Sequence, residues 1–239
     1  MTDITVSTVD FRNAVLATRP HLPDPKADHL TDLCRVHCRI ERYGLIVAAT
    51  NTVTAALAMV DTVDLADGEV GTSFDLGPDE AREIVTLFRP AKMASGESMD
   101  SALRLQVDPF DDALVVTDVS GLFPGRSARF PRTGEAPPLR DFPPLGRTIS
   151  RALEGGVGTE ARAMVEGPSL AAFAAAARVY KRSLVWRHVG PPHRALVTCG
   201  DAFVGALAMG APTPDDLPSI EAVEHAWLAR LGVDDEDDQ

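Results

Sequence analysis

Residues 33 to 50 read LCRVHCRIERYGLIVAAT, a pattern that predicts two antiparallel strands joined by a turn. From Leu33 to Ile40, apolar residues and cysteines alternate with Arg and His, which is the period-two signature of a strand with one buried face. Tyr43 and Gly44 supply the turn, and the run that follows is apolar. Residues 52 to 61 continue in the same style, so we interpret this part of the chain as a β-meander.

The meander belongs to a unit that recurs along the sequence. In each occurrence a short strand leads into a helix and a meander follows the helix. Helices are predicted from apolar spacing and from Pro or Gly stop signals at residues 11–20, 77–90, 145–153 and 168–182. Between Leu153 and Ala161 there is no room for a meander, so the second half of the chain is expected to be shortened.

The recurring unit and a proline-rich stretch divide the chain. Five prolines between Phe130 and Pro144 indicate an extended connector. A last amphipathic helix around Trp227 precedes an acidic tail. It could cover a binding pocket or form a subunit contact, and packing on the second domain is the default expectation. The predicted parts are a first domain at 1–130, the connector at 131–144, a shortened second domain at 145–212, and a C-terminal helix and tail at 213–239.

Composition restricts the setting of the protein. A chain of 239 residues with 45% hydrophobic content can bury a core without disulfides or metals. The three cysteines are an odd number and no secretory leader is recognised, which is typical of reduced thiols and predicts a cytoplasmic protein. The longest apolar runs are far shorter than the roughly twenty residues that cross a bilayer, so no membrane role is expected.

The charges of the chain are unevenly placed. Asp and Glu number 35 against 23 Lys and Arg, a formal net charge of -12. The segments 11–20, 145–153 and 168–182 contain no acid, although average sequence of that combined length would hold about five. Local basic surfaces attract nucleic acid, because Lys and Arg displace the counterions of phosphate, whereas acidic surfaces repel it. The basic residues of these segments are Arg12, Arg19, Arg147, Arg151, Arg178, Lys181 and Arg182.

Four segments, taken in order, resemble the DNA sliding clamp family, which includes the β subunit of DNA polymerase III and proliferating cell nuclear antigen. Gly44 to Asn51 is similar to a clamp strand that follows a turn Gly and Leu, with Asn51 in place of the usual Asp. The others are Asp75 to Leu87, Asp112 to Val116, and Phe203 to Pro212 with its Ala-Met-Gly-Ala-Pro ending. The resemblance covers roughly residues 3 to 212.

The resemblance implies an α+β sliding-clamp fold, with repeated strand-helix-meander units and helices on one face of antiparallel sheets. In that family the helices line a ring around duplex DNA, so the seven basic residues above would contact phosphates without reading sequence. Arg82, Arg89 and Lys92 are secondary candidates because acids share their helix. Clamp rings carry twelve inner helices, so four per chain would favour a trimer over a dimer, while the shortened second domain leaves ring closure open.

The resemblance also implies partners. Clamps tether DNA polymerase and other replication or repair proteins through short peptides that dock in an apolar pocket beside the connector. The matching residues are Phe142, Leu145, Met209 and Pro212. The leading hypothesis is therefore a processivity factor without enzymatic activity. The alternatives are a clamp-fold interaction module that does not encircle DNA, and an enzyme whose site has no sequence signature.

No cofactor or metal is expected. Cys34, His37 and Cys38 have a spacing that invites a metal interpretation. On a strand, however, His37 points away from both cysteines, and no second ligand pair follows at zinc-site spacing. Buried structural thiols are the interpretation that this pattern favours.

Overall fold

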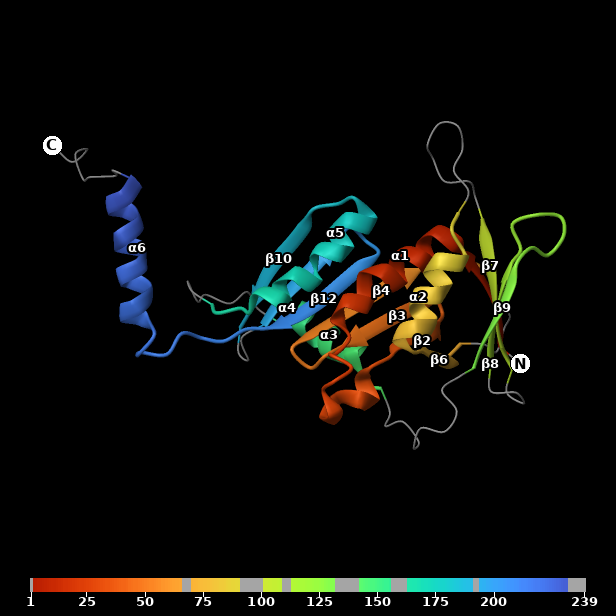
Figure 1. Ribbon diagram of the computed structural model, residues 1–239, viewed down its shortest axis with the longest axis horizontal. Coiled ribbons are helices and arrows are strands. Elements are labelled where there is room, and N and C mark those ends of the chain that lie inside the picture. The colour runs from red at the N-terminus through yellow and green to blue at the C-terminus, as the bar shows by residue number, and fades with distance from the viewer. Residues whose placement is uncertain are drawn as a thin grey trace.

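The computed structural model describes residues 2–65, 70–90, 101–108, 113–131, 142–155, 163–190 and 194–231. Strands in these parts form two antiparallel sheets, and helices pack against them (Figure 1). The predicted strand after the Tyr43 turn is confirmed as β3. Gly44 has a φ of 147°, and a Cβ there would lie 2.5 Å from the carbonyl oxygen of Val60, so glycine is required at this turn.

The first sheet is built by the first half of the chain. Its strand order is β5 (Thr62–Leu65), β1 (Thr2–Ser7), β7 (Ala102–Asp108), β8 (Ala113–Asp118) and β9 (Ser127–Pro131). The predicted short strand before the first helix is present as β1, and the predicted meander after the second helix contains β7 and β8, whereas the short edge strands β5 and β9 were not predicted.

The second sheet joins strands from both halves of the chain. Its order is β10 (Leu184–Val189), β11 (Arg194–Cys199), β12 (Phe203–Ala208), β4 (Thr54–Val60), β3 (Gly44–Thr50), β2 (Val36–Glu41) and β6 (Ser73–Leu76). The junction is the β4–β12 pair, in which Phe203 lies opposite Ala58 and Leu207 opposite Thr54. The sheet therefore runs without a break across the two predicted domains.

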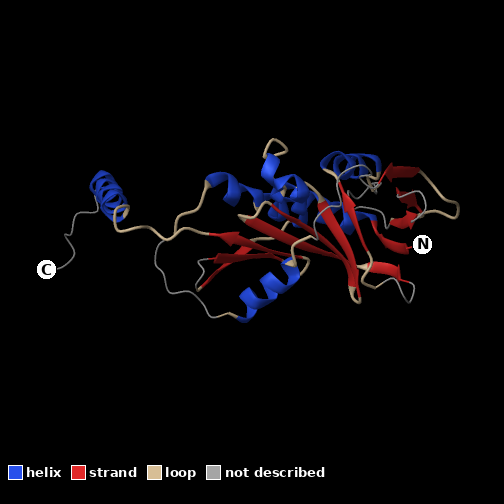
Figure 2. Cartoon of the chain, turned by 90° about the horizontal axis from the view of Figure 1, so that it is seen from below, coloured by secondary structure: helices blue, strands red, loops and turns tan. Residues whose placement is uncertain are grey.

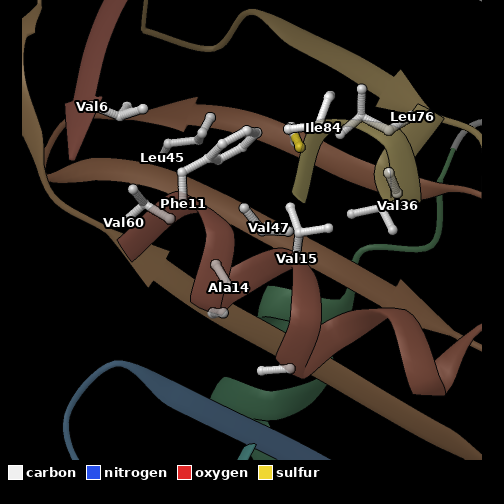
Figure 3. Close-up of a cluster of buried hydrophobic side chains, with 14 of the residues drawn as sticks. Val6, Phe11, Ala14, Val15, Val36, Leu45, Val47, Val60, Leu76 and Ile84 are labelled. Carbon is white, nitrogen blue, oxygen red and sulfur yellow. The ribbon is translucent and has the colours of Figure 1, made fainter. Parts of the chain in front are cut away.

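One helix layer covers one face of the seven-stranded sheet. It consists of α1 (Thr8–Thr18), α2 (Pro78–Leu87), α4 (Gly167–Ala172) and α5 (Ala174–Tyr180). Short 3-10 turns follow α1 at Arg19–His21 (η1) and precede β2 at Asp28–Leu33 (η2). α1 lies between α2 and α5 and buries its apolar side on the sheet, and Figure 3 shows Phe11, Ala14 and Val15 among side chains of β3 and β4.

The helix α3 (Leu145–Glu154) lies on the opposite face of the same sheet (Figure 2). Along β11, Val197 belongs to the main core under the helix layer, whereas its neighbour Leu196 packs with Ile149 of α3. Successive residues of a strand point to opposite faces, so the two helix groups are separated by the sheet. The predicted arrangement of all helices on one face therefore fails for α3.

The last helix, α6 (Leu217–Leu231), stands away from the body of the protein (Figure 1). Val223 is 56% exposed and Trp227 is 54% exposed, and Arg230 lies over the Trp227 ring at 5.4 Å. The expectation that this helix packs on the second domain is wrong.

Candidate nucleic-acid interface

The first group of basic side chains on the helix layer consists of Arg12 and Arg89, which lie beside the contact of α1 with α2. The Arg12 side chain is half-buried, and its Nε donates to the carbonyl oxygen of Val85 at 3.1 Å, which fixes the guanidinium. Burial, and to a smaller extent the charge of Arg89, lowers the pKa of Arg12. Two neighbouring guanidinium groups repel each other, and a bound anion such as a phosphate would relieve that repulsion.

The C-terminal end of α5 forms a second basic group. Arg178, Lys181 and Arg182 are all exposed there. Lys181 ends the helix in the left-handed conformation with a φ of 52°. The carbonyl oxygen of Arg182 accepts a hydrogen bond from the Cys199 thiol at 3.6 Å, which ties this corner to β11. Because α5 packs beside α1, this group and Arg12 belong to the same helix layer.

The layer is less free of acids than the sequence segments predicted. The side chain of Ser7 accepts a hydrogen bond from the backbone N–H of Asp10, so α1 begins at Thr8 and takes Asp10 into its first turn. On α2, Asp79 pairs with Arg82 at 2.7 Å. Arg19 follows α1 on η1 and is half-buried. In the described part of the chain, the candidate cations that stand on this layer are therefore Arg12, Arg19, Arg82 with its partner Asp79, Arg89, Arg178, Lys181 and Arg182. Lys92 lies outside the described residues.

Arg147 and Arg151 do not share this surface. Both are exposed on α3, on the other side of the seven-stranded sheet. The apolar spacing of Leu145, Ile149 and Leu153 predicted the helix, and Leu145 and Ile149 are indeed buried at 8% and 2% exposed while Leu153 is 50% exposed. Such spacing carries no information on which face of a sheet receives the helix. The predicted common lining of all seven residues is corrected accordingly.

A groove follows α3 on that opposite face. It has a volume of about 400 Å³ and is lined by the start of α3, the end of the connector and strands β2, β3 and β4. Phe142 stacks on His37 with ring centroids 4.5 Å apart, and the Arg35 guanidinium lies 5.7 Å from the Phe142 centroid. Asp75 of β6 holds both polar partners, at 2.9 Å from Arg35 and 2.7 Å from His37. A flat aromatic side chain is thus held beside a hollow whose lining combines apolar residues with Arg39, Glu41 and Arg147.

The groove tests the predicted partner pocket residue by residue. Phe142 and Leu145 both line it. Met209 instead packs against the main core, and Pro212 is not among the groove residues. The sequence analysis missed Asp75, because only the pairing of β2 with β6 brings it beside His37. The sequence signal that could have indicated this site was the polar side of residues 35–40, where Arg35 and His37 alternate with apolar residues.

Two properties of the described residues bear on other functions. No three His, Cys, Asp or Glu side chains among them gather closely enough to hold a metal ion. No helix in the same residues combines the length and the apolar character that a bilayer span requires.

Comparison with known proteins was made by sequence and by structure. No protein-family model and no curated protein matches the sequence. Solved structures do match. The β subunit of DNA polymerase III from Thermotoga maritima superposes with a TM-score of 0.57 at 12% identity, over 91% of this chain and 67% of that one. The Pseudomonas aeruginosa sliding clamp bound to griselimycin gives 0.52 at 13%, over 91% and 67%. The Caulobacter crescentus sliding clamp gives 0.52 at 12%, over 91% and 68%.

These structures share the helix layer and antiparallel sheets described above, and the chain therefore has the DNA sliding-clamp fold. Within that fold its similarity is to β subunits of bacterial DNA polymerase III, of whose length it spans about two thirds. The predicted α+β clamp architecture is confirmed.

Proposed function

We propose that this protein is a clamp-type processivity factor that holds duplex DNA against the layer of α1, α2 and α5. The observation that supports it most is the clamp fold combined with a helix layer that carries exposed cations on a chain of net charge -12. Repulsion between DNA and the acidic surfaces would confine contact to this layer. Contacts to phosphates alone permit movement along the duplex, because they do not depend on base sequence.

The number of copies in a closed ring follows from the helices that share one face. The trimer was expected from four helices per chain, but α3 lies on the other side of the sheet. Among the described residues, α1, α2 and the α4–α5 pair remain as three segments on one face. A lining of twelve helices would then take four copies. We propose a homo-oligomer of this size, which native mass spectrometry would measure directly.

The DNA contact is tested by matched charge reversals on the two faces of the sheet. Arg178→Glu with Arg182→Glu changes the helix layer, and Arg147→Glu with Arg151→Glu changes the same number of exposed arginines on α3. We expect only the first variant to weaken binding of a fluorescent duplex. In that variant, the slope of the logarithm of the binding constant against the logarithm of salt concentration should become less negative by about 2, since each lost phosphate contact removes about 0.9 from the slope. Equal losses in both variants would refute the assignment.

Encirclement is tested separately from binding. A ring is retained on circular DNA and slides off after the circle is cut, whereas a protein that only binds one side of the duplex is retained equally on both. We expect loss on cutting. Equal retention would favour the second candidate, a clamp-fold module that binds a replication or repair protein without encircling DNA.

The groove beside α3 supports the proposed tethering of DNA polymerase or of other replication and repair proteins. Its aromatic clamp of Phe142, His37 and Arg35 offers an apolar anchor point. Phe142→Asp should abolish the increase in primer-extension length that the protein gives to a purified polymerase, with duplex binding unchanged. Phe123→Asp is the control, because Phe123 is 83% exposed in a distant loop. Full stimulation by Phe142→Asp would exclude the groove as the docking site.

A further inference from the structure

The first half of the chain shows how two strand-helix-meander units combine. β1 leads into α1 and pairs on one side with β5 and on the other with β7, the first strand after α2. Conversely, β6 leads into α2 and pairs with β2, the first strand after α1. Each unit thus places its first strand beside the meander of the other, and α1 packs beside α2.

The second half of the chain contains the same unit once. Residues 163–165 lead into α4, and Met164 pairs with Gly210 through backbone hydrogen bonds of 2.8 and 2.9 Å. This contact corresponds to β1 with β5, because Gly210 follows β12 as β5 follows β4. Within the described residues, no strand pairs with the other side of residues 163–165. Nor does any described strand pair with the outer edge of β10, which ends the seven-stranded sheet (Figure 1).

Both uncovered edges carry exposed apolar side chains. Met164 is 47% exposed, and on β10 Val185 and Trp186 are 63% and 40% exposed. At the corresponding contact of the first half, the counterpart of Trp186 is Leu105, which faces Ile4, and these two are 0% and 1% exposed. The counterparts of Met164 and Val185 are Thr5 and Arg104, which lie on the outer side of that contact. Unprotected edge strands pair readily with another chain, and exposed apolar surface marks where such pairing occurs.

We propose that a second copy of this chain covers these edges, with residues 163–165 of each copy pairing antiparallel with β10 of the other. The arrangement is self-complementary, because every copy carries one strand segment and one sheet edge that no described strand covers, and a two-fold axis satisfies both at once. The two half-units then form one complete clamp domain between two protomers. None of the six residues brought together is charged, so this contact brings no like charges face to face although each chain carries a net charge of -12.

The first half also supplies the register. Val6 directly precedes Ser7, the N-cap of α1, as Val165 precedes Glu166, the N-cap of α4. Leu103 lies opposite the last residue of β8, as Leu184 lies opposite the last residue of β11. Since Val6 pairs with Leu103, Val165 is expected opposite Leu184 of the other copy. Met164 then lies opposite Val185, and Ala163 opposite Trp186.

The first experiment measures mass by sedimentation equilibrium at low micromolar concentration, in high salt to suppress other charge-dependent contacts. The proposed ring of four copies would consist of two such dimers, and in high salt the full chain should sediment as the dimer, at twice the 25.5 kDa of the protomer. Val185→Lys should raise the dissociation constant at least 100-fold. The control Val63→Lys changes a valine that is 68% exposed on another edge strand, β5, and should leave the dimer intact. A monomeric wild-type protein, or an unchanged dimer in Val185→Lys, would overturn the proposal.

The second experiment tests the register and the competing occupant. Met164→Cys with Val185→Cys should give a disulfide-linked dimer on a non-reducing gel, whereas Val63→Cys with Val185→Cys should not. The variant Val223→Glu with Trp227→Glu charges the exposed side of α6 in the full chain and should remain dimeric. Loss of the dimer in that variant alone would assign the contact to α6 and overturn the proposal. None of these readouts uses DNA, so their outcome is independent of the proposed DNA contact.

Discussion

Acidification should destabilise this protein through His21. The His21 side chain is fully buried at the end of η1, against Phe173 with ring centroids 4.6 Å apart, and neither ring nitrogen has a hydrogen-bond partner among the described residues. Burial favours the neutral ring and lowers the pKa of His21 from 6.5 to about 4. The contact joins the first half of the chain to the second, so its protonation acts on the junction of the two.

The size and sign of the effect follow from these two values. Between pH 6.5 and 4 the unfolded chain binds a proton that the folded His21 refuses, so the free energy of unfolding falls as the pH is lowered. A difference of one pKa unit between the folded and unfolded states corresponds to about 1.36 kcal/mol. The free energy of unfolding therefore falls, through His21 alone, by about 2 kcal/mol at pH 5 and by about 3 kcal/mol at pH 4. The full stability contribution is present above pH 6.5.

Urea denaturation of wild type and His21→Leu between pH 7 and pH 5 measures the contribution of His21 to the pH dependence of the free energy of unfolding. Carboxylates titrate in both proteins, so the difference between their free energies of unfolding should change by about 2 kcal/mol in favour of the variant as the pH falls. His29→Leu replaces an exposed histidine and should follow the wild type. A wild-type to His21→Leu difference that stays constant across this range would refute the reasoning.

Two further changes test the packing of the sheet. A Cβ at Gly205 would lie 2.6 Å from the Phe173 ring, so Gly205→Ala should lower the free energy of unfolding by about 2 kcal/mol, and an unchanged urea midpoint would contradict this. Asp75→Ala removes the carboxylate that binds both His37 and the 7%-exposed Arg35, and should cost about 2 kcal/mol in the same assay. Asp75→Asn should recover part of that loss, and equal values for the two variants would argue against hydrogen bonding as the cause.

Local patterns in the sequence predicted most of the elements. Val36, Cys38 and Ile40 are fully buried, as the alternation from Leu33 to Ile40 requires. The edge strands β5 and β9 were not predicted, because their short sequences carry little pattern of their own. In β9, for example, Phe130 is the single buried residue. Such a strand exists because β8 offers it a partner, which is information that its own residues do not hold.

The candidate site depended more on contacts between distant parts of the chain. The apolar side of α3 was visible in Leu145 and Ile149, but the face of the sheet that it covers is set by the path of the chain before it. The ion pair of Arg35 with Asp75 joins residues that only strand pairing brings together. Phe142 was identified through the family resemblance, whereas its stacking partner His37 was considered only as a metal ligand and set aside.

The pairing of β4 with β12 also has a consequence for synthesis. The edge of β4 near residue 55 remains without its neighbour until the segment near residue 205 has been made. At 5–20 residues per second, a ribosome takes roughly 8 to 30 s to supply the intervening stretch of about 150 residues. During that interval the nascent chain presents one apolar strand edge without its neighbour, so completion of the second sheet waits for the synthesis of β12.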